Sequence, residues 1–87
     1  MSSPSPWQFP CDFPIKAMGQ TGADFPDLIA GIVSRHAPDL DLTTLRVQSS
    51  RNGRYQSITL TIRARNREQL DAIYRELSGH ERVLFAL

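Results

Sequence analysis

One stretch of this chain, from Ser57 to Arg65, alternates between apolar and polar side chains without a break. Successive side chains of a β-strand point to opposite faces of its sheet, so the alternation predicts a strand with one buried face and one solvated face. β-Branched residues are frequent in it, as is typical of strands. The expected inward positions are Ile58, Leu60, Ile62 and Ala64. The fold must therefore contain a sheet that is covered on one side.

Three further segments have strand character: 13–18, 45–49 and 83–87. In the first, alternate residues from Phe13 onward are expected to face inward, and Pro14 fits an edge or an early strand position because it has no N–H. A turn over 51–54 joins the second segment to the strand at its C-terminal side. Its Asn52-Gly53 pair is expected to supply the positive φ angles that a tight hairpin favours.

Two helices alternate with these strands. Asp24 can cap the first, whose apolar stripe ends before Pro38. Asn66 can cap the second, with Gln69 in the capping-box position. The resulting order is β-α-β-β-α-β, which predicts an α+β, ferredoxin-like sandwich. Right-handed crossovers place both helices on one face of a four-stranded antiparallel sheet, with the strands in the spatial order 4-1-3-2.

The length of the chain, 87 residues, leaves room for one domain. Residues 1–10 hold three of the six prolines and three serines. Proline fixes φ and removes a hydrogen-bond donor, so this composition predicts a flexible tail. Residues 11–87 then form a single ferredoxin-like domain.

Charge and segment composition restrict where the protein acts. A formal net charge of +1 gives no global field that would draw the chain to nucleic acid or to a membrane. No apolar run reaches the roughly 18 residues of a membrane span, and the N-terminus lacks the features of a secretory signal. The single cysteine, Cys11, cannot form an internal disulfide, which fits a reducing compartment. We expect a soluble, cytoplasmic protein that makes no membrane contact.

Several short motifs follow one another at defined spacings along the chain. They are Phe13-Pro14, Lys16, Met18-Gly19, His36-Ala37-Pro38, Ser49-Ser50, Gly53, Tyr55, Ser57-Ile58-Thr59, Leu70, Tyr74 and Leu77. Their order resembles the YbeD-like family, a small bacterial family of unknown function, from Phe13 to Leu87. The resemblance implies a ferredoxin-like fold similar to the ACT-type regulatory domains of amino-acid metabolism. The family has no assigned catalytic residues, so none is carried over.

The residues themselves also give no indication of catalysis. His36, His80 and Cys11 do not form a nucleophile with a base and an orienting group. There is no Cys-x-x-Cys, and no set of ligands has the spacing of a metal site. We therefore expect a protein that is not an enzyme and has no catalytic residue, metal or cofactor.

Charge is unevenly distributed along the chain. Between Leu42 and Arg67 there are six arginines and no acid, whereas the remaining residues hold four basic and nine acidic side chains. Arginine suits bidentate contacts to carboxylate or phosphate, so this segment predicts a docking surface for an acidic protein partner. The expected partner-binding residues are Arg46, Arg51, Arg54, Arg63 and Arg65. A solvated sheet face with charged edges is a second interpretation of the same pattern.

The glycine-containing stretch after the first strand is a second candidate site. ACT-like domains place effectors at this loop and at a dimer interface, so the family resemblance implies a small-molecule effector site. Its residues are Gly19, Gln20, Thr21, Gly22 and Asp24. They end at a helix N-terminus, which can hold an anion. The two glycines can also simply form the turn.

Nucleic-acid binding is a weaker alternative. An RRM has the same fold and stacks bases on aromatic side chains of its central strands. Here the outward positions of the central strand are Ser57, Thr59, Thr61 and Arg63, and Tyr55 cannot form a platform alone. We therefore expect a regulatory or protein-interaction module, with an effector-binding domain as the alternative.

The last segment, 83–87, is apolar on both of its expected faces. Val83, Phe85 and Leu87 are expected to point one way, and Leu84 and Ala86 the other. One face serves the core and the other needs cover. Trp7 and Phe9 of the tail, or a second copy of the chain, would supply it. We therefore predict either tail docking or a homodimer.

Overall fold

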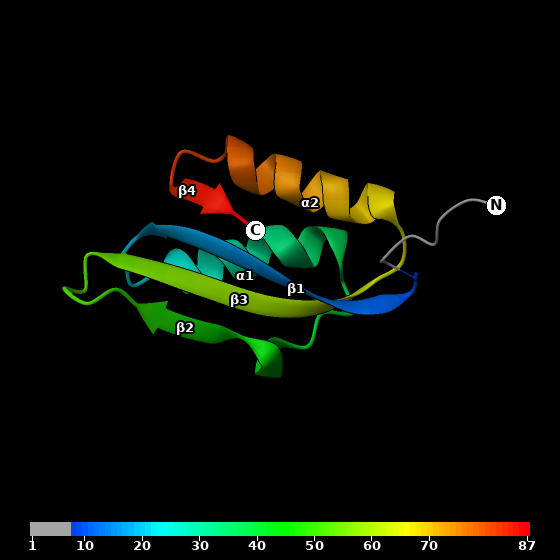
Figure 1. The fold of residues 1–87 in the computed structure, drawn as a ribbon, viewed down its shortest axis with the longest axis horizontal. Helices are drawn as coiled ribbons and strands as arrows, with labels where there is room; N and C mark the ends of the chain where they lie inside the picture. Colours follow the sequence, from blue (N-terminus) through cyan, green and yellow to red (C-terminus); the bar gives the residue numbers. More distant parts are fainter. Residues whose placement is uncertain (1–7) are drawn as a thin grey trace.

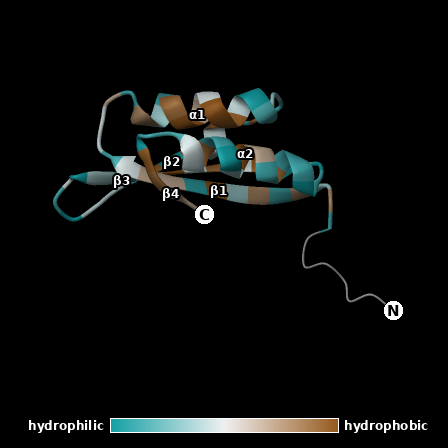
Figure 2. Ribbon diagram, turned by 90° about the horizontal axis from the view of Figure 1, so that it is seen from above, coloured by the Kyte–Doolittle hydropathy of each residue, from teal (hydrophilic) through white to brown (hydrophobic). Residues whose placement is uncertain are grey.

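The computed structural model describes residues 8–87, and the predicted elements occur in the predicted order. These elements are β1 (Cys11–Gln20), α1 (Phe25–His36), a 3-10 helix (Leu42–Thr44), β2 (Arg46–Ser49), β3 (Tyr55–Ala64), α2 (Arg67–Gly79) and β4 (Val83–Ala86). The strands form an antiparallel sheet in the order β2-β3-β1-β4 (Figure 1). Both helices cover the same face of this sheet (Figure 2). The ferredoxin-like α+β prediction is therefore confirmed, including its strand order.

The two central strands pair along their whole length, from Cys11 opposite Ala64 to Gln20 opposite Tyr55. β4 reaches only the second half of β1. The Lys16 N–H donates to the Leu87 carbonyl at 3.0 Å, and the Leu87 N–H donates back at 2.8 Å. Pro14, two residues earlier on the same side of β1, lies beyond this pairing. Its missing N–H therefore costs no sheet hydrogen bond, as expected for an edge position.

The core lies between the sheet and the two helices, as the hydrophobic pattern predicts. The inward side chains of β3 are at most 1% exposed, and Phe25 and Leu77 of the helices are fully buried. The other fully or almost fully buried apolar residues are Ile15, Ala17, Ile29, Ile32, Val33, Ala37, Leu70 and Ile73. The helices therefore cover one face of the sheet and leave the opposite face to solvent.

The cap of α2 is the one that the sequence predicts, but Gln69 has a larger role than expected. The Asn66 Oδ1 accepts the Gln69 N–H at 2.8 Å. A capping box would return the Gln69 side chain to the Asn66 N–H. Instead, its Oε1 accepts the Arg65 N–H at 2.7 Å, and its Nε2 donates to the His36 carbonyl at 2.8 Å. This buried side chain therefore joins the end of β3 and the end of α1 to α2.

The β2–β3 hairpin departs from the prediction at one residue. Gly53 has a positive φ of 74°, but no other residue of the described part of the chain does, so Asn52 does not share this role. The Ser50 N–H donates to the Tyr55 carbonyl at 2.8 Å and closes a four-residue loop. Such a loop is built around an ordinary turn and needs one left-handed position, which falls to glycine. Asn52 instead accepts the Arg54 N–H through its side chain at 3.1 Å.

The expected faces of β4 are right for Phe85, Ala86 and Leu87 but wrong at the start of the strand, at Val83. The pairing of β1 with β4 shifts register between Met18 and Gly19, and such an irregularity breaks the alternation of side chains. As a result, Val83 is buried and Ala86 packs against the core. The exposed side chains are Leu84 (56%), Phe85 (46%) and Leu87 (66%).

The N-terminal side of the domain is only partly described. Phe9 is half-buried and packs against the core, whereas Trp7 lies outside the described residues. The tail-docking prediction therefore remains a prediction for most of residues 1–10. Within residues 8–87, no helix is long and apolar enough to cross a membrane.

Candidate binding face

Two rows of outward side chains cross the middle of the helix-free face of the sheet, called the open face below. Residues directly opposite one another in neighbouring strands share a face, so the register places them side by side. The first row is Arg46, Thr59 and Lys16, and the second is Gln48, Ser57, Met18 and Phe85. Leu87 extends the first row beyond Lys16, with which it exchanges hydrogen bonds. The open face is therefore polar over β2 and β3 and apolar toward β4.

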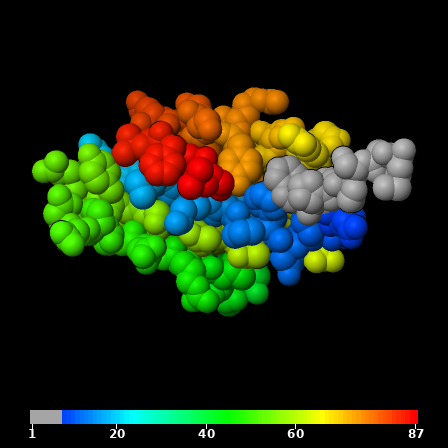
Figure 3. Space-filling view, in the orientation of Figure 1, coloured from blue at the N-terminus to red at the C-terminus, as the bar shows by residue number. Residues whose placement is uncertain are grey.

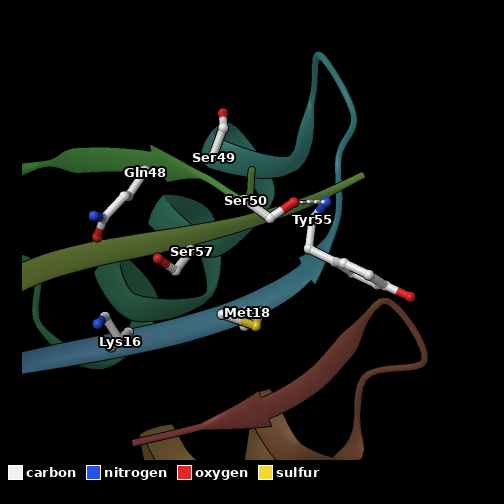
Figure 4. A pocket seen from close by; sticks show the side chains of 7 residues that line it. All are labelled: Lys16, Met18, Gln48, Ser49, Ser50, Tyr55 and Ser57. Carbon is white, nitrogen blue, oxygen red and sulfur yellow. Dashed lines mark hydrogen bonds between the residues drawn. The ribbon is translucent and has the colours of Figure 1, made fainter. Parts of the chain in front are cut away.

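A polar hollow of about 230 Å³ lies on this face between β1, β2 and β3. Figure 4 shows Ser57 between Gln48 on one side and Lys16 on the other. Ser57 is only 5% exposed, but its hydroxyl makes no hydrogen bond within residues 8–87 and is accessible from the hollow. At the far end, the Ser50 hydroxyl accepts the Tyr55 N–H at 3.0 Å. The hollow therefore holds a free hydroxyl next to an amide and an ammonium group.

The five arginines that the sequence predicts to bind a partner fall into two groups, those with an ion pair and those without. Arg63 lies 3.3 Å from the Asp12 carboxylate, and Arg65 lies 4.0 Å from that of Asp39. Three of the five form no ion pair within the described residues: Arg46, Arg51 and Arg54. The last two lie on the hairpin, which projects past the ends of the helices (Figure 1). The structure therefore does not gather the five arginines into one patch.

Lys16 is a cation that the sequence analysis missed as a site residue. It forms no ion pair within residues 8–87 and lies on the open face, across Thr59 from Arg46. The alternation of β1 was a sufficient signal, since it places Lys16 opposite to the buried Ile15 and Ala17. We call Lys16, Arg46, Arg51 and Arg54 the basic face.

Charge is distributed unequally between the sheet and the rest of the chain. Strands β1, β2 and β3 with the hairpin loop hold five basic side chains and one acidic side chain, a formal charge of +4. The rest of the chain holds five basic and eight acidic side chains, a formal charge of −3. The near-neutral total therefore conceals a basic sheet and an acidic remainder, in which α1 and α2 together hold three basic and four acidic side chains.

The loop that was the second candidate site is bound to the neighbouring hairpin. Gly19 and Gln20 belong to β1, and Gly19 is buried. The Thr21 N–H donates to the Arg54 carbonyl at 2.9 Å, and its hydroxyl donates to the Gly53 carbonyl at 2.7 Å. The Thr21 N–H and hydroxyl are therefore already occupied, although an effector bound at this loop would need such donors.

Asp24 stands at the N-cap of α1 but does not cap it as expected. Its backbone is already helical (φ −95°, ψ −3°), and its side chain accepts no cap hydrogen bond. Arg82 instead donates to both of its carboxylate oxygens, at 2.7 and 3.0 Å. The same guanidinium lies 5.7 Å from the centre of the Phe25 ring. Nothing in the local sequence indicated this contact, which joins residues 58 positions apart.

This end of α1 offers few donors to an anion. The Phe25 N–H already donates to the Gly22 carbonyl at 3.1 Å, and Pro26 has no N–H. A shallow hollow of about 320 Å³ lies nearby, lined by Gln20, Glu81, Arg82 and Leu84. A ligand there would meet one arginine, but that arginine is already paired with Asp24.

Replacing Asp24 with asparagine is expected to lower stability at neutral pH but not in acid. The hydrogen bond from Arg82 lowers the pKa of the Asp24 carboxyl from its ordinary value of 3.8. A lowered pKa in the folded state stabilises the fold above the unfolded pKa, and this contribution is lost as the pH falls through the folded pKa. Urea midpoints of the wild type and of Asp24→Asn should therefore converge in acid.

The partner variant provides the control. Arg82→Gln should lower the urea midpoint at neutral pH to a similar extent, and combining it with Asp24→Asn should cause little further loss. Midpoints that stay equally far apart from neutral to acid pH would show that the ion pair does not stabilise the fold.

Comparison with known proteins agrees with this fold. Residues 4–87 match the family described as protein of unknown function (DUF493). A UPF0250 protein of Nitrosomonas europaea is 48% identical over 87 residues, which is the full length of both chains. A UPF0250 protein of Azotobacter vinelandii is 47% identical over 81 residues, covering 92% of this chain and 88% of its own. The family descriptions assign no catalytic activity.

A solved structure shows the same architecture. The solution NMR structure of the ACT domain from GTP pyrophosphokinase of Chlorobium tepidum superimposes with a TM-score of 0.64. The match covers 87% of this chain and 84% of that domain, at 20% sequence identity. At this identity the likeness concerns the fold alone, and it confirms the expected similarity to ACT-type domains. Together with the full-length relatives, these matches show that the chain belongs to the DUF493 family of bacterial proteins of unknown function.

Proposed function

We propose that this protein is a non-catalytic regulatory module of the cytoplasm that binds an acidic segment of a partner protein through its basic face. The observation that carries the proposal is the absence of ion pairs, within residues 8–87, for all four cations of this face. Elsewhere, Arg63, Arg65 and Arg82 each face a carboxylate. Unpaired cations on a sheet of formal charge +4 attract an acidic surface and accelerate its association.

Of the five arginines predicted from the sequence, the proposal gives the main role to Arg46, Arg51 and Arg54. Arg63 and Arg65 already have acidic neighbours, so a partner would have to displace Asp12 or Asp39 to reach them. Their contribution to binding is therefore expected to be smaller than that of the unpaired arginines.

The test is affinity capture from bacterial cytoplasmic extract, followed by binding measurements with the purified partner. The charge-reversed variant carries Arg46→Glu, Arg51→Glu and Arg54→Glu. Reversing three surface charges is expected to weaken binding by about 100-fold at low salt, since exposed pairs contribute up to about 1 kcal/mol each and reversal adds repulsion. Wild-type affinity should also fall as salt is added.

Arg75→Glu provides the control for reversing the charge of an exposed arginine outside the basic face. Arg75 is exposed on α2 and forms no ion pair within the described residues, but it belongs to the helical layer. The control should bind like the wild type. Equal binding by the wild type and the triple variant would contradict the proposal.

A small-molecule effector domain is the second candidate. The hollow beside Gln20 and Arg82 supports it, as does the likeness to an ACT domain of a larger enzyme. An amino-acid panel titrated against the isotope-labelled protein would shift the amide signals of Thr21, Gly22 and Asp24. A flat titration across the panel would remove this candidate.

A further inference from the structure

We propose that the hollow on the open face binds the carboxylate of one acidic side chain of the partner, and that Met18, Phe85 and Leu87 bind an apolar side chain next to it. This inference rests on the proposed function. It adds that the acidic segment of the partner also carries an aliphatic or aromatic residue close to the acidic one.

Three donors of different kinds surround the hollow. The Ser57 hydroxyl lies at its base, the Lys16 ammonium on the β1 side and the Gln48 amide on the β2 side (Figure 4). A carboxylate accepts several hydrogen bonds at once, and bonds from an ammonium group are charge-assisted. Neutral donors alone would not distinguish a carboxylate from an amide, so Lys16 supplies the preference for the charged group.

Ser57 offers the hollow a hydroxyl that no other described residue binds. Every buried side-chain polar atom within residues 8–87 has a hydrogen-bond partner, so the Ser57 hydroxyl is an accessible one. The residue as a whole is 5% exposed, and the hollow is where its hydroxyl is reached. Its neighbours Thr59 and Thr61 on the same face are more exposed. The Ser57 hydroxyl can therefore donate a hydrogen bond to a ligand that enters the hollow.

The strands fix the spacing of these donors. Gln48 and Met18 lie directly opposite Ser57, and Lys16 lies opposite the next outward residue, Thr59. Neighbouring strands are about 4.8 Å apart, and Gln48, Ser57 and Lys16 all line the same hollow. Groups held on paired strands lose little freedom on binding.

The apolar half of the site lies directly beside this hollow. Phe85 is opposite Met18 and is 46% exposed, and Leu87 is 66% exposed. The side chains of β4 stand at the surface beside β1 (Figure 3). An aromatic ring left in water gains free energy when a partner covers it. From β3 to β4 is two strand spacings, or about 10 Å, which an extended chain spans in about three residues.

A second copy of the chain is a poorer occupant of this face. Two open faces brought together would both carry the basic sheet, so like charges would repel. The acidic side chains of this protein lie mainly in its helical layer and its loops. A segment of another protein that carries acidic and apolar side chains would be attracted to the basic sheet and would also cover its apolar side.

The experiment selects peptides from a random displayed library against the full chain. The expected peptides combine Asp or Glu with an aliphatic or aromatic residue within about four positions. Lys16→Glu should weaken their binding by about 30-fold, and Ser57→Ala and Phe85→Ser by about tenfold each. Arg75→Glu, at an exposed position on α2, should bind within about twofold of the wild type. Thermal unfolding verifies that every variant is folded.

Ser57→Ala separates a built site from a merely basic surface, because it changes no charge. One contrary result is that the selected peptides bind the Arg51→Glu/Arg54→Glu variant more weakly than the wild type, but bind Lys16→Glu and Ser57→Ala as tightly. That result would overturn this inference and leave the proposed function standing. Peptides without acidic residues would overturn both. Single-stranded RNA bound in a Lys16-dependent way, or self-association abolished by Phe85→Ser, would also overturn the assignment to an acidic segment.

Discussion

Gly19→Ala is expected to destabilise the protein by about 3 kcal/mol or more, at the upper end of the cost of overpacking. A Cβ at this position would lie 2.2 Å from the Arg82 carbonyl oxygen and 2.6 Å from the Phe25 ring. Neither neighbour can move freely, since one is backbone and the other is a fully buried side chain. The irregular pairing of β1 with β4 at this residue therefore depends on glycine.

Gly31→Ala is the matched control, and urea unfolding is the measurement. Gly31 lies within α1, and a Cβ there would meet nothing within 4 Å. Alanine is favoured over glycine inside a helix by up to about 1 kcal/mol, so this variant should be as stable as the wild type or slightly more stable. A Gly19→Ala protein with wild-type stability would show that β4 does not approach β1 as described.

Gln69→Leu is expected to cost about 2–4 kcal/mol, the second largest effect. The change removes both hydrogen bonds of a side chain that is 8% exposed. The Arg65 N–H and the His36 carbonyl would each lose a partner, and a buried unsatisfied group costs about 1–3 kcal/mol. Leucine has a similar size, so the loss would report the hydrogen bonds more than the packing.

Gln20→Leu controls for the same chemical change at an exposed site. Gln20 forms no hydrogen bond through its side chain within the described residues, so its loss should change stability by no more than about 0.5 kcal/mol. Hydrogen exchange offers a second measurement, because Gln69→Leu should speed exchange of the Arg65 amide. Equal stability of the two variants would contradict the role assigned to Gln69.

Local patterns predicted most of the fold. The alternation of β3 and the helical stripes before and after it are properties of neighbouring residues, and they gave the order of elements and the strand order. The errors lie where distant residues decide. Asp24 meets Arg82 instead of capping its helix, and the register shift at Met18 and Gly19 separates Val83 from the face that Phe85 and Leu87 share.

The candidate site was predictable only in part. The run of arginines without acids was visible in the sequence, and so was the outward position of Ser57. Which arginines are paired was not visible, because Asp12 meets Arg63 across 51 residues. Only the pairing of three strands places Lys16 and Gln48 near Ser57, so the hollow could not be predicted from any one segment.

Mapping amide chemical shifts on the full chain will show whether the partner binds on the open face of the sheet. The selected acidic peptide or the captured partner is added to the isotope-labelled protein. We expect the shifted signals to cluster at Lys16, Gln48, Ser57 and Phe85, with little change in α1 and α2. Shifts concentrated on the helical layer, with the signals of β1 and β3 unmoved, would contradict it.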